Sequence, residues 1–241
     1  WKYFIDQLPK EKADKCLFIL HTELISDAGT DLHAVSKYLF GEDYKNVIFS
    51  TSKISAQQLN YFYNMADAQI LLTSNEGWGL SLTEAMLTGT PIIANVTGGM
   101  QDQMRFENNG KWMEVNADFP SNHNGTVKYC GDCAFPVFPT SRSIQGSPIT
   151  PYIWDDRCRP EDATEQIMNL YNISKEERQE YGLAGREWAM SDEAGFTAEM
   201  MAQRIIKNID KTFETFTPRE KFEFINVTEL EADKLPHKLL Y

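Results

Sequence analysis

The sequence has few cysteines, no long apolar run and no excess of positive charge. Four cysteines in 241 residues are too few for a disulfide scaffold. No apolar run approaches the ~20 residues that a membrane-spanning helix needs. A formal net charge of −12 provides no broad basic field to neutralise the phosphates of nucleic acid or of an anionic membrane. We therefore expect no nucleic-acid partner and no transmembrane segment. The net charge still permits a local basic pocket for one small anion.

No signal peptide opens the chain, but this says little because residue 1 need not be the natural start. We predict a cytoplasmic location and leave peripheral membrane association open. Hydrophobic residues make up 42% and aromatic residues 12% of the chain, as in ordinary globular proteins. The length allows one large domain, or one domain with an appendage.

The first 115 residues alternate between short apolar runs and amphipathic stretches. The apolar runs predict strands at 16–22, 46–51, 68–74, 91–96 and 111–115. The stretches between them have helical periodicity, and several carry a cap or a glycine stop. Short strands that alternate with helices indicate βα units, and hence a parallel sheet covered on both faces. The predicted fold class is α/β, with a doubly wound, Rossmann-like parallel sheet.

The alternation ends after residue 115. Residues 116–150 are dense in Gly, Pro, Ser and Asn, and we predict an irregular insertion there. Helical patterns return at 159–171, 174–190 and 191–216. The predicted division is one domain at 1–216, which includes the insertion, and a C-terminal tail at 217–241.

Residues 75–84, with the sequence NEGWGLSLTE, form a strand–loop–helix corner between an apolar run and a helical stretch. Ligands of open parallel sheets bind at such corners, beyond the carboxyl ends of the strands. Gly77 and Gly79 let a ligand approach the backbone closely, and the amides of the helix N-terminus suit a phosphate. Glu76 and Glu84 could accept hydrogen bonds from hydroxyl groups on either side. An anion site between two acceptors of hydroxyl groups suits a sugar, a diphosphate and a ribose, which are the parts of a nucleotide-sugar.

The same residues have a purely structural interpretation. Ser81 and Glu84 match the S-x-x-E capping box, in which Glu84 would bond back to the helix N-terminus. Trp78 could be a core aromatic residue, and the two glycines could form a simple tight turn.

The surroundings of the corner favour the functional interpretation. Residues 66–99 resemble the signature of GT-B fold glycosyltransferases that carry the E-x7-E motif, a mostly retaining group that includes glycogen synthases, sucrose synthases and lipid mannosyltransferases. The matching positions are Ala66, Asp67, Ser74, Glu76 to Leu80, Glu84 to Met86, Gly89 to Pro91, Gly98 and Gly99. The resemblance covers about residues 1–115 well and the final helices loosely, and the insertion lies outside it.

The resemblance implies a role for each residue of the corner. Glu76 would be the catalytic residue, in contact with the donor sugar near the reacting carbon. The backbone of Gly77, Trp78, Gly79 and Leu80 would meet the sugar and the diphosphate. Glu84 would bind the ribose hydroxyls. The family often has Phe or Tyr at the position of Trp78, so we expect the larger ring to reshape the sugar pocket.

Two further segments are expected to serve the donor. Ser52 and Ile54 follow a predicted strand, at the place where family members hold the base. Thr97, Gly98 and Gly99 open another helix beside the cavity. The substrate would be a UDP- or GDP-sugar, with no cofactor and no obligatory metal.

One departure from the family concerns the start of the sequence. The family's donor domain begins with a strand and an Arg…Lys pair that neutralises the leaving diphosphate, whereas this chain starts at the helix that would follow. An N-terminal acceptor domain is also expected upstream. The chain therefore looks like the donor-binding part of a longer enzyme, with an incomplete active site.

The remaining reactive side chains have alternative interpretations. Cys130 and Cys133 form a C-x2-C pair that could hold zinc with Cys158 and His123. Unpaired thiols or a disulfide are the alternatives. Cys16, within a predicted strand, is expected to be a buried thiol.

Arg142 lies in a polar loop that is either an ordinary surface loop or a rim of the donor or acceptor cleft. His21, at the end of a predicted strand, is either a structural histidine or another residue of the cleft.

The predicted function is transfer of a sugar, as by a hexosyltransferase, from a nucleotide-sugar to an acceptor, with retention of anomeric configuration. One alternative is a nucleotide-sugar epimerase of the same architecture. Another is a non-catalytic module that binds nucleotide-sugar or acts as a scaffold. The sequence upstream of Trp1 would separate these alternatives most cheaply.

Overall fold

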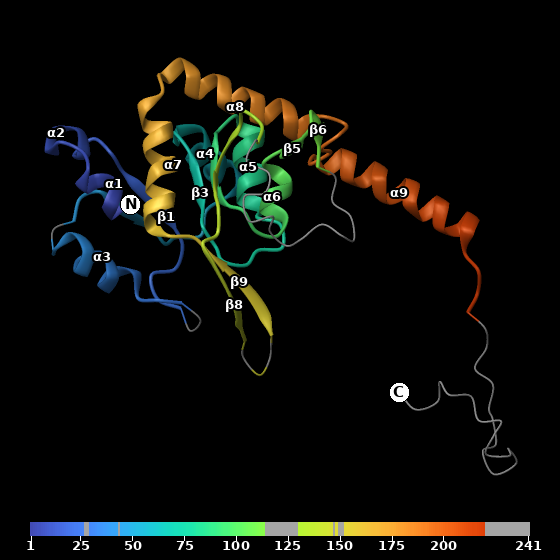
Figure 1. Cartoon of the computed structure of the whole chain (residues 1–241), viewed down its shortest axis with the longest axis horizontal. Helices are drawn as coiled ribbons and strands as arrows, with labels where there is room; N and C mark the ends of the chain where they lie inside the picture. The colour runs from blue at the N-terminus through green and yellow to red at the C-terminus, as the bar shows by residue number, and fades with distance from the viewer. Residues whose placement is uncertain (27–28, 43, 114–129, 147, 149–151, 220–241) are drawn as a thin grey trace, which may run out of the picture. The chain divides into compact units, whose positions relative to one another are not determined.

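The computed structural model describes residues 1–26, 29–42, 44–113, 130–146, 148 and 152–219 (Figure 1). The chain divides into two compact units, Trp1–Ala198 and Glu199–Tyr241. This division falls inside the range 1–216 that the sequence analysis treats as one domain, and the domain limits given there stay a prediction. Among the described residues, no helix is both long and apolar enough to cross a bilayer.

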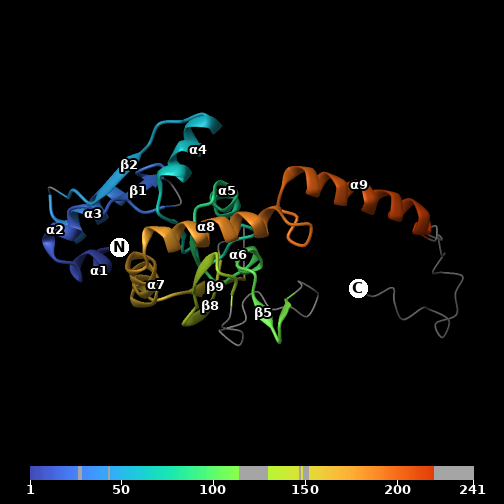
Figure 2. The same cartoon turned by 90° about the horizontal axis from the view of Figure 1, so that it is seen from above.

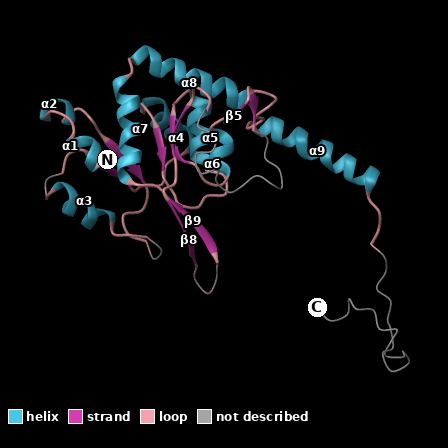
Figure 3. Cartoon of the chain, viewed as in Figure 1, coloured by secondary structure: helices cyan, strands magenta, loops and turns pink. Residues whose placement is uncertain are grey.

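The first unit is an α/β structure with parallel strands, as the sequence analysis predicted (Figure 3). The helices of the chain are α1 (Lys2–Asp6), α2 (Lys10–Ala13), α3 (Leu32–Phe40), α4 (Ala56–Met65), α5 (Leu80–Thr88), α6 (Gly99–Gln103), α7 (Pro160–Asn172), α8 (Lys175–Met190) and α9 (Ala198–Thr215). The strands are β1 (Phe18–His21), β2 (Val47–Ser50), β3 (Gln69–Leu71), β4 (Ile92–Asn95), β5 (Glu107–Asn108), β6 (Lys111–Trp112), β7 (Ala134–Val137), β8 (Ser141–Gln145) and β9 (Ile153–Arg157).

The central sheet has three parallel strands in the order β3-β4-β7. All four residues of β4 are buried, as expected for a strand covered on both faces. Its side chains alternate between two hydrophobic clusters: Ile92 and Ala94 pack with Ala134 of β7 in one, and Ile93 packs with Phe135 in the other. The sheet therefore separates two cores.

Helices cover both faces of this sheet. The cluster with Ile92 includes Met86 of α5 and Trp188 of α8, whereas the cluster with Ile93 includes Ile167 of α7 and Phe4 of α1. Helices α5 and α7 accordingly lie on different sides of the central strands (Figure 2). This is the doubly wound arrangement that the alternating sequence pattern indicated.

A second parallel pair, β1 and β2, is hydrogen-bonded separately from the central sheet. Among the described residues, β1 pairs only with β2, and β3 pairs only with β4. Each of these two strands therefore has one edge without a neighbouring strand. The side chains of β3 are only partly buried, in contrast to those of β4.

Two parts of the sequence prediction were wrong in detail. Of the predicted strand 111–115, residues 111–113 are described; Lys111–Trp112 forms a short antiparallel pair with β5 rather than a strand of the main sheet. The segment 116–150, predicted to be irregular, contains β7 and β8. Strand β7 completes the central sheet, and β8 pairs with β9 in a hairpin. Residues 114–129 lie outside the described part of the chain.

The packing of α5 against α8 depends on a glycine in each partner segment. A Cβ atom added to Gly182 of α8 would lie 1.9 Å from the carbonyl oxygen of Gly89, which ends α5. No side chain fits at that distance, so the two backbones approach as closely as they do only with glycine at position 182.

We expect Gly182→Ala to lower the free energy of unfolding by about 1–3 kcal/mol, because the helices must separate to admit the methyl group. The intrinsic helix propensity of alanine acts in the opposite direction, by about 1 kcal/mol. Urea unfolding followed by circular dichroism measures the change. Gln179→Ala, at an exposed position of the same helix, is the control and should stay within about 0.5 kcal/mol of the parent. A Gly182→Ala chain as stable as the parent would contradict the close contact.

Candidate functional site

The corner at 75–84 lies at the carboxyl end of β3, where the chain turns into α5. Gly79 is the N-cap of α5 and has a left-handed backbone with φ +86°. The first amides of α5, at Leu80 and Ser81, have no partner within the helix because every helix leaves its first N–H groups unsatisfied. Leu80 and Gly77 are exposed. The corner thus presents backbone donors to solvent, a geometry suited to an anion.

The side chain of Trp78 is fixed by packing. Its Nε1 donates to Thr83 Oγ1 at 2.9 Å, and its ring meets the ring of Phe196 edge-on at 5.0 Å. Gln103 accepts from Thr83 and donates to the carbonyl oxygen of Trp78, so α6 holds both ends of the residue. The indole is part of the packing between α5 and the chain after α8, and the expectation that it reshapes a sugar pocket stays a prediction.

Glu84 does not form the capping box. Helix α5 begins at Leu80, and no side chain caps it, so Ser81 is already inside the helix. Glu84 is exposed, and its Oε2 accepts a hydrogen bond from the hydroxyl of Tyr63 at 2.7 Å. Burial, followed by this hydrogen bond, raises the pKa of Tyr63, so its proton stays on the hydroxyl and Glu84 stays the acceptor. The capping box proposed for Ser81 and Glu84 was therefore wrong, and the structural contact of Glu84 is the one with Tyr63.

Glu76 stands on the other side of the exposed amides. Its side chain is half-buried, and its Oε1 lies 3.4 Å from the amide nitrogen of Trp78, within the same loop. This local bond orients the carboxylate without removing it from solvent. Glu76 and Glu84 therefore flank the N-terminus of α5, as the sequence analysis expected, although their contacts with a ligand stay a prediction.

Gly98 and Gly99 pack directly against the corner. A Cβ atom at Gly98 would lie 1.9 Å from the carbonyl oxygen of Glu76, and one at Gly99 would lie 2.3 Å from that of Gly77. The amide of Gly99 donates to the carbonyl oxygen of Gly77 at 3.1 Å. These two glycines, predicted as donor-binding, thus allow one loop to support the other, and a contact with the donor stays a prediction.

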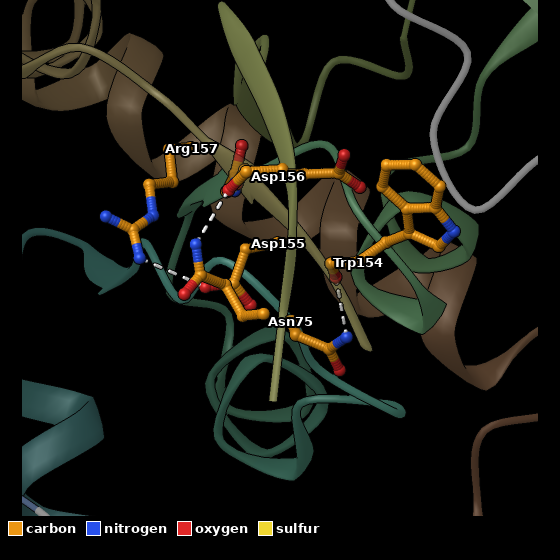
Figure 4. A network of polar contacts seen from close by, with 8 residues as sticks. Asn75, Trp154, Asp155, Asp156 and Arg157 are labelled. Atoms are coloured by element: carbon orange, nitrogen blue, oxygen red, sulfur yellow. Dashed lines mark hydrogen bonds and ion pairs between the residues drawn. The ribbon is translucent and has the colours of Figure 1, made fainter. Parts of the chain in front are cut away.

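A buried polar network, which the sequence analysis did not identify, joins the corner to the β8–β9 hairpin (Figure 4). Asp156 is 1% exposed; its amide donates to the carbonyl oxygen of Ser74 at 2.7 Å, and its Oδ2 accepts from Thr97 Oγ1 at 2.8 Å. Asn75 Nδ2 donates to the carbonyl oxygen of Trp154 at 2.9 Å. The hairpin is therefore bonded to the loop after β3 through its backbone, and to the loop after β4 through the carboxylate of Asp156. No motif marks Asp156 in the sequence, and only its tertiary partners reveal it.

The loop after β2 holds the residues predicted to bind the base. Ile54 is half-buried and precedes α4, which has a capping box formed by Ser55 and Gln58. Helix α4 also carries Tyr63, the partner of Glu84, so it connects this loop with α5. At the same edge His21, at the end of β1, bonds to Ser50 at the end of β2 at 3.0 Å. This pairing gives His21 a structural partner.

The cysteines do not converge on one site. Cys130 and Cys133 pack in the cluster with Ile92, whereas Cys158 packs in the cluster with Ile93, on the other face of the sheet. All four cysteines are free thiols, so the disulfide alternative was wrong. Burial raises the pKa of the Cys130 thiol and of the Cys133 thiol to about 12. The proposed set of three cysteine ligands was therefore wrong. Its fourth member, His123, lies outside the described residues. Within the described residues, no group of three or more His, Cys, Asp or Glu side chains is placed to hold a metal ion.

Comparisons with known proteins give a family match over a range that includes the corner. Residues 25–119 match the family described as "Glycosyl transferases group 1". The chain is 24% identical over 181 residues to the "Uncharacterized glycosyltransferase MJ1607" of Methanocaldococcus jannaschii, which covers 73% of this chain and 42% of that protein. It is 35% identical over 65 residues to the "Trehalose synthase" of Pyrococcus horikoshii, which covers 27% of this chain and 16% of that protein. The matches support a group 1 glycosyltransferase domain.

A solved structure confirms the likeness of the fold. The crystal structure of WaaG, a glycosyltransferase involved in lipopolysaccharide biosynthesis, matches with a TM-score of 0.51 at 14% identity, over 85% of this chain and 42% of that one. At this identity the match concerns the fold alone. The chain spans less than half the length of MJ1607 and of WaaG.

Asp102 lies on α6, next to the loop that supports the corner, and the cost of burying its charge can be tested through the stability of the fold. Burial raises its pKa to about 6, above the value of about 4 in an unfolded chain. Because the folded state binds this proton more tightly, the charge on Asp102 costs stability above pH 6, and that cost disappears as the pH falls below 4. We expect Asp102→Asn to raise the free energy of unfolding at pH 7 by about 1–2 kcal/mol, a value discounted because the side chain is only half-buried.

Chemical denaturation at pH 7 and at pH 3.5 checks this expectation, because the difference between Asp102→Asn and the parent should vanish at the lower pH. Glu187→Gln, at an exposed position of α8, is the control and should change little at either pH. A gain that is the same at both pH values would show that the charge of Asp102 is not its cause.

Proposed function

We propose that this chain is the donor-binding part of a glycosyltransferase that transfers a sugar from a UDP- or GDP-sugar to an acceptor, with retention. The observation that carries the proposal is the corner itself: two carboxylates, of Glu76 and Glu84, flank the open N-terminus of α5 behind a parallel strand. The family match over residues 25–119 supports a transferase. The relatives named trehalose synthase support a sugar as the group transferred.

Each part of the corner has a role in the proposed reaction. The amides at Leu80 and Ser81 hold the diphosphate, where the partial positive charge of the helix N-terminus opposes the negative charge of the leaving group. Glu84 accepts hydrogen bonds from the ribose hydroxyls through Oε1, while Tyr63 holds Oε2. Glu76 binds hydroxyls of the donor sugar near the reacting carbon. Catalysis consists mainly of positioning and of stabilising charge on the leaving diphosphate.

The proposal includes a segment outside residues 1–241 that completes the domain. Strands β1 and β3 each lack a neighbour on one edge among the described residues. One additional parallel strand between them would give the order β2-β1-x-β3-β4-β7, which is the 3-2-1-4-5-6 order of doubly wound dinucleotide-binding folds. The chain spans 42% of the length of MJ1607 and of WaaG, so longer proteins of this kind contain additional segments. We expect that segment to supply the missing cations for the diphosphate, and an acceptor domain to precede it.

Calorimetry with UDP and with GDP tests the proposal directly. We expect one of them to bind to the isolated chain, but weakly, because half of the phosphate neutralisation comes from outside it. A folded chain that binds neither nucleotide, nor any UDP- or GDP-sugar, would refute the donor-binding role. Hydrolysis or isomerisation of a nucleotide-sugar by the complete enzyme without an acceptor would favour an epimerase instead.

Glu84→Gln should weaken binding of the preferred nucleotide by about 1–3 kcal/mol, because the amide cannot accept from both ribose hydroxyls while it also satisfies Tyr63. Thermal unfolding should show an unchanged fold. Glu180→Gln, at an exposed position of α8, is the matched control and should bind normally. Normal binding by Glu84→Gln would limit Glu84 to its contact with Tyr63.

Glu76→Gln should weaken binding of the nucleotide-sugar without weakening binding of the nucleotide alone. We expect the affinity for UDP or GDP to stay within about twofold of the parent, since this carboxylate contacts only the sugar, and the affinity for the nucleotide-sugar to fall by about tenfold. Calorimetry with both ligands measures the ratio. In the complete enzyme the same substitution should depress the transfer rate. An unchanged ratio together with full activity would remove Glu76 from the reaction.

A further inference from the structure

The hairpin formed by β8 and β9 has one face that runs from a buried base to an exposed end. Its strands are antiparallel, with Arg142 opposite Asp156 and Ile144 opposite Trp154. Since side chains two residues apart share a face of a strand, these four lie on the same face. Asp156 is buried, whereas Ile144 and Trp154 are exposed by 54% and 46%. We call this surface the hairpin face.

The base of the hairpin face is fixed to the corner. The amide of Asp156 bonds to Ser74, and its carboxylate accepts from Thr97 and lies 3.4 Å from Arg142 Nε. The side chain of Asn75, next to Glu76, donates to the carbonyl oxygen of Trp154 (Figure 4). The backbone of the strand that carries the exposed indole is therefore bonded, at Trp154 and at Asp156, to the loop that holds Glu76.

Arg142 also orders the indole. Its guanidinium group lies over the ring of Trp154, 4.7 Å from the ring centroid, while its Nε is held by the buried Asp156. A stacked cation and a hydrogen-bonded backbone restrict the rotation of the indole. An aromatic ring that is both half-exposed and already ordered loses little conformational entropy when a ligand stacks on it.

We propose that the hairpin face is an acceptor subsite, in which a sugar ring of the acceptor stacks on Trp154. The inference rests on the proposed function, because the acceptor must lie beside the donor sugar at Glu76. A sugar ring presents an apolar C–H face that matches an indole, and its hydroxyls tolerate the wet surroundings of an exposed hairpin. In this account Arg142 and Asp156 are positioning residues, and Trp154 is the residue that touches the acceptor.

Saturation-transfer NMR on the full 241-residue chain tests the subsite. The probes are methyl α-glucoside, methyl α-mannoside and maltose, each at millimolar concentration. We expect at least one of them to receive saturation from the protein, and Trp154→Ala to lower that signal by about tenfold. Trp154→Phe, which keeps an aromatic face, should retain part of the signal. Tyr38→Ala, which removes a ring that is 89% exposed on α3, is the matched control and should leave the signal unchanged.

Thermal unfolding first establishes that each variant is folded, and binding of UDP and GDP is measured on the same samples. Loss of the sugar signal in Trp154→Ala, with nucleotide binding retained, supports the subsite. Loss of that signal in a chain that binds neither nucleotide supports a sugar site on the hairpin but refutes the proposed donor function. The inference is overturned if no probe binds to the parent, if Trp154→Ala binds as the parent does, or if ultracentrifugation shows that Trp154 instead mediates self-association.

Discussion

The contact between the corner and the loop after β4 determines the geometry of the candidate site. The backbone at Gly98 and Gly99 approaches the carbonyl oxygens of Glu76 and Gly77 so closely that a Cβ atom at either glycine would overlap them. Gln103, one turn further along α6, then holds the carbonyl oxygen of Trp78. The direction of the α5 amides and the position of Glu76 both follow from this contact, because the loop between β3 and α5 has no regular secondary structure of its own.

The sequence predicted the parts of the molecule that local patterns determine. The alternation of apolar and amphipathic segments identified β1 to β4 and the helices between them, because a strand covered on both faces needs a continuous apolar run, as in Ile92–Asn95. It missed β7, since Ala134–Val137 contains a proline and lies in a segment dense in turn-forming residues. That short segment becomes a strand because β4 offers it a partner edge, which no local pattern reveals.

The site was predictable to the same limited extent. Gly77, Gly79 and the two glutamates could be identified because they are close together in the sequence and have distinctive chemistry. The capping box at Ser81 and Glu84 was misleading, since Gly79 with its left-handed backbone already begins the helix. Asp156 could not be found, because its partners Ser74 and Thr97 are about sixty to eighty residues away along the chain. A burial of 1% for a carboxylate is a property of the folded chain alone.

The exposure of Trp154 has an optical consequence. All five tryptophans lie in the described part of the chain, and Trp154 is exposed by 46%, whereas Trp1, Trp78, Trp112 and Trp188 are partly or fully buried. The intrinsic fluorescence therefore combines a red-shifted emission, which a soluble quencher such as acrylamide can reach, with emission from shielded indoles. The accessible fraction reports on the hairpin, and the shielded fraction reports on the core. One spectrum thus distinguishes an event at the surface from a loss of tertiary structure, without an attached dye.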